Sequence, residues 1–191
     1  MRLLLASSSV YRRQLLQQLG IPFDYAAPNI DETQLQDETP QDYVKRLAIA
    51  KAQALHQQFP MHWIIGSDQC CVVNGQITGK PLTVERAIAQ LSLCNGRSVE
   101  FFTGLSLISP EGEVLSLVEP FTVHFRELTL EEITRYVERE QPLDCAGSFK
   151  VEGLGIHLFK QLQGRDPNAL IGLPLIGLLD LMREAGIKPL G

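Results

Sequence analysis

One acidic residue stands out because it lies where the surrounding pattern calls for an apolar side chain. Asp68 interrupts the segment WIIGSDQCCVV (63–73), which is otherwise typical of a strand buried on both faces. Burying an unpaired carboxylate costs several kcal/mol or more. We therefore expect Asp68 to serve a purpose that offsets this cost.

A lysine presents the same anomaly on a predicted helix. Lys51 lies in the middle of an apolar stripe with helical spacing. Such a lysine commonly lays its stem on the core and turns its ammonium group outward. The alternative is a cation directed into a cleft to meet an anion. The stripe consists of Val44, Leu47, Ala48, Ala54 and Leu55.

An arginine repeats the anomaly near the N-terminus. Arg12 lies on the apolar face that Leu15, Leu16 and Leu19 define in a helix preceded by three serines, Ser7–Ser9. The amides at a helix N-terminus bind anions, and a guanidinium group suits phosphate. The serines alone are equally well explained as caps, but together with Arg12 they favour a phosphate site.

The unusual charged residues therefore combine cations with acids. Lys80 follows in the segment GKP (79–81), and Glu32 lies in an acidic loop after the first helix. Carboxylates hold Mg²⁺, while Arg and Lys neutralise phosphates, so this mixture suits a phosphate chain and a divalent metal. The segment is not a Walker A loop, because Pro81 replaces the required Ser or Thr.

Composition argues against several other classes. The net charge of −5 gives no general attraction to nucleic acid or anionic membranes, and no apolar run approaches the roughly 20 residues of a membrane span. The four histidines lack metal-binding spacing, and no HExxH or GxSxG motif occurs. The four cysteines lack CxxC spacing, which favours free thiols in a reducing cytoplasm.

Strand and helix signals alternate along the 191 residues, which allow one large domain or two small lobes. Thr39 and Pro40 predict the start of the second helix, and Thr129 the start of the fourth. The mixture favours an α/β protein with a partly antiparallel sheet. Strands are predicted at Leu3–Ala6, 63–73, Val99–Ile108, Val114–Phe125 and Ile156–Leu162, with a further short strand that ends at Thr78 after a turn at Asn74 and Gly75. Helices are predicted at Val10–Leu19, Pro40–Phe59, Val84–Leu93, 130–140 and Pro174–Glu184.

At these residues the chain resembles the Maf family of nucleotide pyrophosphatases. LLASSSVYRRQLLQQLGI (4–21) is similar to the family signature ASxSPxRxxLL, with Val10 in place of the usual proline. The resemblance covers nearly the whole chain in order. It continues through NIDET (29–33), RLAIAKAQAL (46–55), GSDQ (66–69), ITGKP (77–81), DCAGSFKVEGLGI (144–156) and GLPLIGL (172–178).

The resemblance implies a single Maf-like domain over residues 1–191, with a Maf/Ham1-like mixed sheet flanked by helices and two lobes around a central cleft. It implies an enzyme that cuts nucleoside triphosphates between the α and β phosphates with a divalent cation, Mg²⁺ or Mn²⁺. It also allows a homodimer. By the same resemblance Asp68 is the catalytic residue, which either accepts the proton of the attacking water directly or mainly holds the metal. Glu32 is a second metal ligand, and the phosphate-binding residues are Ser7, Arg12, Lys51 and Lys80.

Three positions resemble those that set base preference in the family: Tyr11, Gln69 and Glu152. An aromatic, Gln and Glu there resemble the 7-methyl-GTP branch, whereas Arg, Thr and Gln are typical of dTTP and UTP enzymes. An aromatic can stack on the cationic 7-methylguanine ring, and a carboxylate can accept from its N–H donors. Packing of Tyr11 in the core and a solvated Glu152 are the alternative.

Three other functions stay open at this point. The same reaction on dTTP, UTP or another modified nucleotide needs the same phosphate and metal residues. A nucleotide-binding regulator of cell division that hydrolyses little needs the cations but not Asp68, so the acid favours an enzyme. A phosphomonoesterase is a third alternative.

Overall fold

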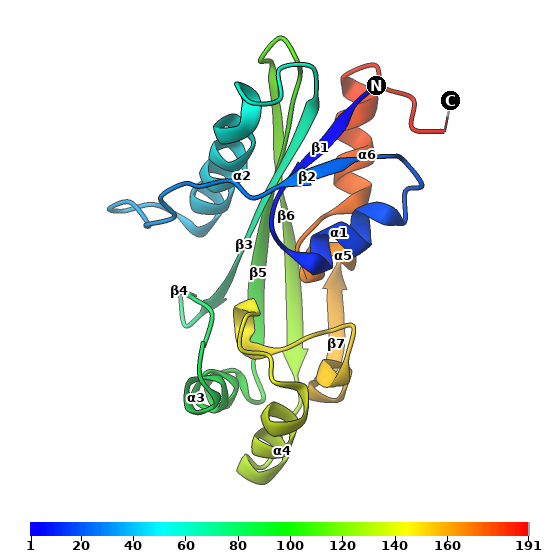
Figure 1. Ribbon diagram of the computed structural model, residues 1–191. Coiled ribbons are helices and arrows are strands. Elements are labelled where there is room, and N and C mark those ends of the chain that lie inside the picture. The colour runs from blue at the N-terminus through cyan, green and yellow to red at the C-terminus, as the bar shows by residue number, and fades with distance from the viewer. Residues whose placement is uncertain (191) are drawn as a thin grey trace. The chain divides into compact units, whose positions relative to one another are not determined.

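The structure is a computed structural model, and it describes residues 1–190. A seven-stranded mixed sheet with flanking helices forms the framework, in the strand order β2-β1-β3-β5-β6-β7, with β4 beside β3 (Figure 1). The pairs β1–β2 and β1–β3 are parallel, whereas β3–β4 and β6–β7 are antiparallel. The strands are β1 (Leu3–Ala6), β2 (Asp24–Ala26), β3 (Trp63–Val73), β4 (Gln76–Thr78), β5 (Ser98–Ile108), β6 (Val114–Phe125) and β7 (Phe159–Gly164).

The helices follow the caps that the sequence provides. Thr39 caps α2 and Thr129 caps α4, where Glu132 completes a capping box. Gly20 adopts a positive φ of 66° just after the first helix. The helices are α1 (Val10–Gln17), α2 (Pro40–His56), α3 (Val84–Cys94), α4 (Leu130–Glu140), α5 (Asn168–Ile171) and α6 (Leu175–Glu184), with 3₁₀ turns η1 (Ala146–Ser148) and η2 (Leu154–Leu158).

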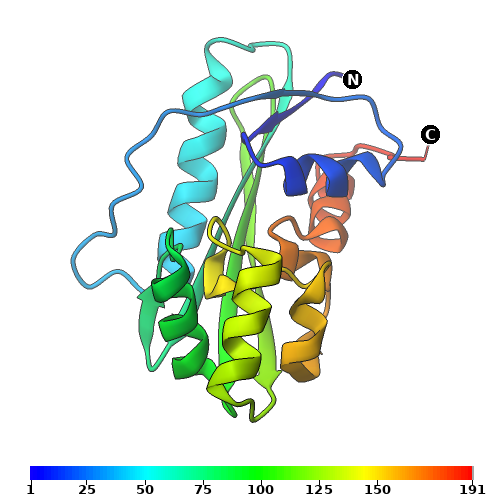
Figure 2. The same ribbon diagram turned by 60° about the horizontal axis from the view of Figure 1, so that its bottom comes forward.

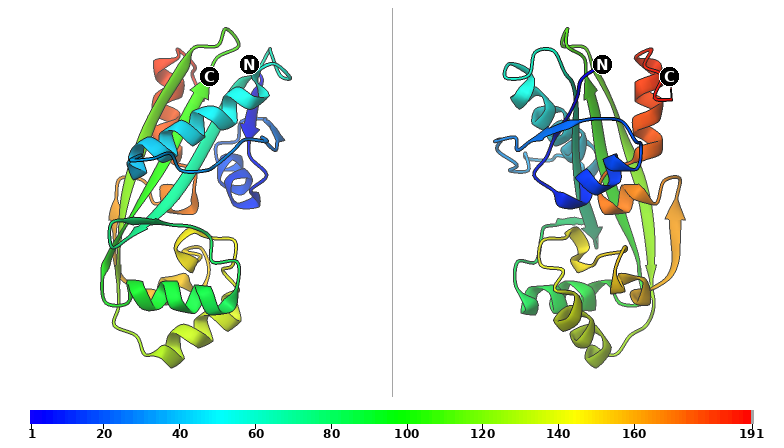
Figure 3. Two further views of the ribbon diagram at one scale, coloured as in Figure 1. Left: turned by 90° about the vertical axis from the view of Figure 1, so that its left-hand side faces the viewer. Right: turned by 45° about the vertical axis from the view of Figure 1, so that its right-hand side comes forward.

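The chain divides into two compact units, of which the first comprises residues 1–69, 102–119 and 168–191. Its sheet is apolar on both faces because helices cover both. Leu4 and Ile64 pack with Leu55 of α2 on one face, while Leu5 packs with Leu16 of α1 and other residues on the opposite face. The right-hand view of Figure 3 shows α2 on one side of the strands and α1 and α6 on the other.

The second unit comprises residues 70–101 and 120–167. Its helices α3 and α4 lie side by side (Figure 2). Its core contains a chain of aromatic rings in edge-to-face contact. The ring centroids of Phe149 lie 5.4 Å from Phe101 and 4.7 Å from Phe159, which in turn lies 5.3 Å from Phe125. These contacts fix the irregular segment around Phe149 on the strands of this unit.

Most predicted elements are present, with shifted ends. The predicted strand Ile156–Leu162 was wrong in its first half, because residues up to Leu158 form η2 and β7 begins at Phe159. The first two helices end earlier than predicted, at Gln17 and His56. The stripe of the second helix was wrong at one position, because Ala54 is exposed whereas Ala52 is buried and packs in the core with Leu4 and Ile64.

Within residues 1–190, no helix combines the length and the apolar character that crossing a membrane requires.

Candidate active site

Two glycines in the sheet let α2 approach the strands closely. A Cβ on Gly66 in β3 would lie 2.0 Å from the carbonyl oxygen of Ala48, and one on Gly104 in β5 would lie 2.1 Å from that of Val44. The hydroxyl of Ser106 donates to the Ala48 carbonyl at 2.9 Å. Only glycine permits this contact. The helix is therefore fixed directly over the strand that carries Asp68.

Successive side chains along β3 point to opposite faces of the sheet, so this buried strand contacts different elements on its two faces. Ile64 packs in the core beneath α2, and Ile65 packs in the core on the opposite face. Residues two apart on a strand share a face, so Gly66 and Asp68 also point toward α2. Ser67 points to the other face and contacts the segment around α5.

Lys51 joins two carboxylates. Its ammonium nitrogen lies 2.6 Å from Asp68 Oδ1 and 2.9 Å from Glu32 Oε1. Lys51 and Asp68 are each 7% exposed, whereas the Glu32 side chain is half exposed. The position of Lys51 one turn after Ala48 brings it to Asp68, so the stem does not turn outward to solvent. A buried carboxylate is thereby paired, which answers how Asp68 is accommodated.

Arg12 approaches the same group of charges from α1. Its Nε donates to the carbonyl oxygen of Gly172 at 2.8 Å, and Gly172 has a φ of +119°. Burial lowers the pKa of the Arg12 guanidinium, while the charges of Asp68 and Glu32 raise it in opposition. The Ser67 hydroxyl also reaches the Gly172 carbonyl, at 2.8 Å. Gly172 therefore anchors both a cation and the strand residue beside Asp68.

The serines before α1 lie at the carboxyl end of β1. Ser9 is the N-cap, and its hydroxyl accepts from the Arg12 amide at 3.4 Å. Ser7 is buried, and its hydroxyl accepts from the Ser9 amide at 3.1 Å. The parallel pairing of Leu5 with Ile65 brings this end of β1 to the part of β3 that precedes Asp68. Ligands of open α/β sheets usually bind at this end of the strands.

Gln69 is held by the backbone of α5. Its amide nitrogen lies 2.6 Å from the carbonyl oxygen of Ala169 and 3.1 Å from that of Leu170. The hydroxyl of Thr103 donates to the same Ala169 carbonyl at 2.9 Å. Tyr11 is half-buried in the first turn of α1. Both residues belong to the first unit, and their role in base preference stays a prediction.

Lys80 belongs to the second unit and is exposed, but the backbone around it is anchored. The amide nitrogen of Gln90 donates to the Gly79 carbonyl at 3.0 Å, and the Leu82 amide donates to the Leu143 carbonyl at 3.0 Å. Ser148, fully buried with a φ of 60°, donates its hydroxyl to the side-chain oxygen of Gln90. Gln90 thus connects the Lys80 segment to η1.

Glu152 is an exposed residue in a turn of the second unit that α4 supports. The Tyr136 hydroxyl accepts from the Lys150 amide at 3.0 Å, and a carboxylate oxygen of Glu140 accepts from the Leu154 amide at 2.6 Å. A Cβ on Gly155 would lie 2.3 Å from the Lys150 carbonyl oxygen. The turn is therefore ordered around Glu152.

The residues that meet in the first unit fit a divalent cation. Asp68 and Glu32 each place a carboxylate oxygen within hydrogen-bonding distance of the same nitrogen, so their oxygens gather around one point. No cluster of three or more His, Cys, Asp or Glu suited to a metal occurs within residues 1–190. Mg²⁺ commonly takes one or two carboxylates and fills its other positions with water and substrate phosphates, which matches this donor set.

Several supporting residues escaped the sequence reasoning. Gly66 and Gly104 carried the signal of glycine inside an apolar strand, which often marks a close backbone approach. Ser67 and Gly172 meet across more than a hundred residues of sequence, and no local pattern predicts that contact. A polar residue such as Gln90 is ordinary on a helix, so no feature of the sequence around it indicated a supporting role.

Comparisons with known proteins show the family and the fold of the chain. The family model described as "Maf-like protein" matches residues 2–185. The Ham1 protein of Staphylococcus aureus has a similar structure, with a TM-score of 0.53 and 16% identity over 97% of this chain and 100% of that one. A HAM1 protein from Coxiella burnetii has a TM-score of 0.53 and 14% identity over 96% and 99% of the two chains. The Ham1-like fold predicted from the sequence is confirmed.

Proposed function

The chain belongs to the Maf-like protein family, and from this premise we propose that it is a nucleoside triphosphate pyrophosphatase acting on 7-methyl-GTP. It hydrolyses the bond between the α-phosphorus and the oxygen that bridges to the β-phosphorus. The products are 7-methyl-GMP and diphosphate. The observation that carries the proposal is the contact of Lys51 with both Asp68 and Glu32, beside Arg12.

This group of charges supplies what phosphate-anhydride hydrolysis requires. Asp68 takes a proton from the attacking water, whose oxygen forms the new bond to the α-phosphorus as diphosphate leaves. Lys51 and Arg12 balance the negative charge of the phosphates, and the Ser7 hydroxyl can donate a hydrogen bond to a phosphate oxygen. Lys80 is a further proposed phosphate contact. Because Lys51 already forms an ion pair with Asp68, the charge of this buried carboxylate is compensated before a nucleotide binds.

A divalent cation, Mg²⁺ or Mn²⁺, is the proposed cofactor. Bound between Asp68 and Glu32, it would neutralise phosphate charge and polarise a phosphoryl oxygen. Lys51 shares the oxygens of both carboxylates, so its ammonium group must adjust when a cation binds. Lys51 is then free to contact a phosphate, which fits its proposed role.

The base preference rests on Tyr11, Gln69 and Glu152. The amide nitrogen of Gln69 is committed to the Ala169 and Leu170 carbonyls, so its side-chain oxygen is the end suited to a base donor. Glu152 can accept from N1–H and the 2-amino group of guanine while it balances the charge of the methylated ring. Tyr11 can stack on that ring.

Product analysis tests the reaction. The protein is incubated with Mg²⁺ or Mn²⁺ and with 7-methyl-GTP, GTP, dTTP and UTP in parallel, alongside Asp68→Asn. Monophosphate and diphosphate mainly from 7-methyl-GTP support the proposal. Turnover mainly of dTTP or UTP retains the reaction and overturns the base assignment. Orthophosphate release indicates a phosphomonoesterase, and tight binding without any release favours a regulator of cell division.

A second variant tests base preference alone. Glu152→Gln removes a charge from an exposed side chain and leaves the turn's contacts with α4 in place. We expect the ratio of 7-methyl-GTP to UTP turnover to fall. An unchanged ratio contradicts the role of Glu152.

Three further predictions stay predictions. They are that residues 1–191 form one domain with two lobes, that the protein acts in the cytoplasm and that it forms a homodimer.

A further inference from the structure

Glu32 reaches the site from a segment that is neither helix nor strand. Residues 27–39 connect β2 to α2, and Glu32 lies within them. Its carboxylate nevertheless lies 2.9 Å from the buried Lys51 ammonium. A metal ligand on an irregular segment needs support from its neighbours, because freely rotating backbone would carry the carboxylate away. The hydrogen bonds of this segment show where the support comes from.

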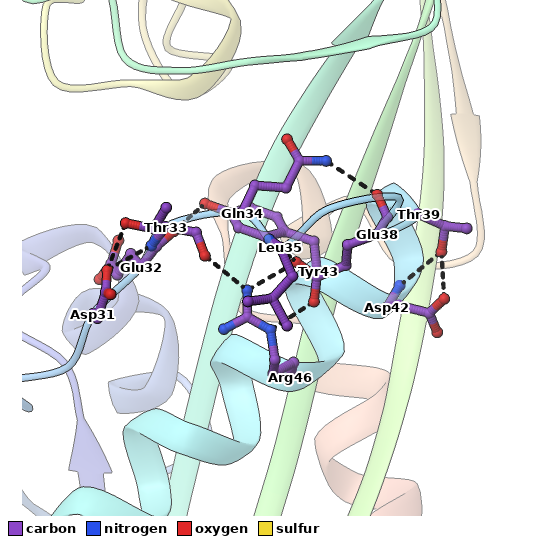
Figure 4. A network of polar contacts seen from close by, with 10 residues as sticks. All are labelled: Asp31, Glu32, Thr33, Gln34, Leu35, Glu38, Thr39, Asp42, Tyr43 and Arg46. Atoms are coloured by element: carbon purple, nitrogen blue, oxygen red, sulfur yellow. Dashed lines mark hydrogen bonds and ion pairs between the residues drawn. The ribbon is translucent and has the colours of Figure 1, made fainter.

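Arg46 of α2 supplies most of that support (Figure 4). Its Nε lies 2.6 Å from Glu38 Oε1 and its Nη2 lies 2.8 Å from Glu38 Oε2, which is a bidentate ion pair. The same Nη2 donates to the Thr33 carbonyl at 3.1 Å. The Glu38 side chain is only 7% exposed. One guanidinium therefore binds the segment near its end and directly after Glu32.

Glu38 in turn binds the middle of the segment. Its Oε2 accepts from the Leu35 amide at 3.0 Å, and its carbonyl accepts from the Gln34 side chain at 3.0 Å. Hydrogen bonds from Arg46 lower the pKa of the Glu38 carboxyl, so the pair is ionised at neutral pH. The segment thus folds back on the carboxylate that Arg46 holds.

Tyr43 binds the backbone of Glu32 itself. Its hydroxyl donates to the Glu32 carbonyl at 3.0 Å, and the Arg46 guanidinium lies 5.7 Å from the centre of its ring. Tyr43, Arg46 and Lys51 all belong to α2. The same helix therefore holds the backbone of Glu32 at one turn and pairs with its carboxylate about two turns later.

We propose that the Arg46–Glu38 ion pair and Tyr43 are positioning residues that place Glu32 for metal binding. They act through Glu32 and touch neither nucleotide nor metal. The inference deepens the proposed function and rests on it, since it assumes that Glu32 is a metal ligand. It goes beyond that function by assigning metal affinity to residues outside the charged group.

The test combines metal binding with hydrogen exchange. The dissociation constant of Mn²⁺ from the free protein is measured by electron paramagnetic resonance. The second constant is the Mg²⁺ concentration for half-maximal diphosphate release, measured with nucleotide in excess. Arg46→Met is expected to raise both constants roughly 10–100-fold, the usual effect of losing an outer partner of a metal ligand. Arg46→Lys retains one contact with Glu38 and is expected to lie between. Tyr43→Phe removes a single hydroxyl and serves where Arg46→Met does not fold.

A matched control is the ion pair between Arg135 and Glu131, an exposed pair one turn apart on α4. Arg135→Met should leave both metal constants unchanged. Exchange of the Leu35 amide should accelerate in Arg46→Met, because its acceptor, Glu38, loses its anchor. In the background of Glu32→Gln, Arg46→Met should cause no further loss of metal affinity, because the residue through which it acts is already altered.

Each outcome supports or overturns the proposal. Unchanged metal constants in Arg46→Met and Tyr43→Phe overturn it, as does an equal additional loss in the Glu32→Gln background. If the wild-type protein releases no diphosphate from any nucleotide, the proposed function fails. Mn²⁺ binding and Leu35 exchange then still decide whether the ion pair places Glu32.

Discussion

Lys51 and Asp68 form an ion pair of 2.6 Å although each residue is only 7% exposed. The pair exists because Gly66 and Gly104 bring α2 against the sheet, so that a helix residue and a strand residue meet without solvent between them. Breaking such a pair by removing one charge leaves the other buried and uncompensated. Asp68 is therefore expected to matter for stability as well as for its proposed role in activity.

Asp68→Asn should separate these two effects. Diphosphate release should fall by roughly 10²–10⁴-fold, the usual contribution of a general base. Because Glu32 remains 2.9 Å from Lys51, the unfolding free energy should fall by less than the roughly 3–5 kcal/mol typical of an orphaned buried charge. Kinetics and urea unfolding measure the two quantities. Glu111→Gln, an exposed acid, is the control, and near-normal turnover in Asp68→Asn contradicts the assigned role.

Gly66→Ala should displace α2 and lower stability. The new Cβ would lie 2.0 Å from the Ala48 carbonyl oxygen, which is backbone and cannot rotate away. We expect a loss of at least the roughly 1–3 kcal/mol that overpacking costs. Gly79→Ala is the matched control, because a Cβ there meets nothing within 4 Å. Thermal unfolding checks both variants, and equal melting temperatures would contradict the close approach.

The sequence predicted those parts of the site that local pattern determines. The apolar run around Asp68 and the stripe around Lys51 marked both residues as outliers, and Thr39 with Pro40 fixed the start of α2. The short exposed strand β2 lacks an alternating pattern, and the four residues of α5 are too few to show helical periodicity. Both were therefore missed.

The remaining features depend on tertiary contacts. Ile156 and Leu158 alternate like strand residues, but the backbone there turns as η2 because the amides of Gly153 and Gly155 both donate to the Lys150 carbonyl. The contact of Arg12 with the Gly172 carbonyl joins residues 160 positions apart. Such contacts follow from the packing of elements, which composition and spacing do not specify.

Gln90→Met should weaken the proposed contact of Lys80 with phosphate, because it loosens the backbone beside Lys80 while Lys80 itself is unchanged. Gln90 joins the Gly79 carbonyl to the buried Ser148, and methionine retains its volume but neither hydrogen bond. We expect roughly 1–3 kcal/mol of lost stability, because the buried Ser148 hydroxyl loses its acceptor. We also expect a higher KM for nucleotide, with no further rise in KM when Lys80→Ala is already present. Ser92→Ala on the same helix is the control. An unchanged KM in Gln90→Met would contradict the positioning of Lys80.

The thiols should be unreactive in the folded protein. Burial raises the pKa of Cys145 to about 12, with Asp144 adding to the rise, and raises that of Cys94 to about 11. The thiolate is the reactive form, so at pH 8 only about one Cys145 thiol in 10⁴ is ionised. A disulfide reagent at pH 8 should therefore modify these cysteines slowly in the folded protein and all four cysteines rapidly in guanidinium chloride. The rate of Cys145 alkylation should rise about tenfold per pH unit up to pH 11. At a given pH the rate should be higher in Asp144→Asn, because Asp144 helps to raise the pKa of the thiol. A rate that levels off near pH 9 would contradict the raised pKa.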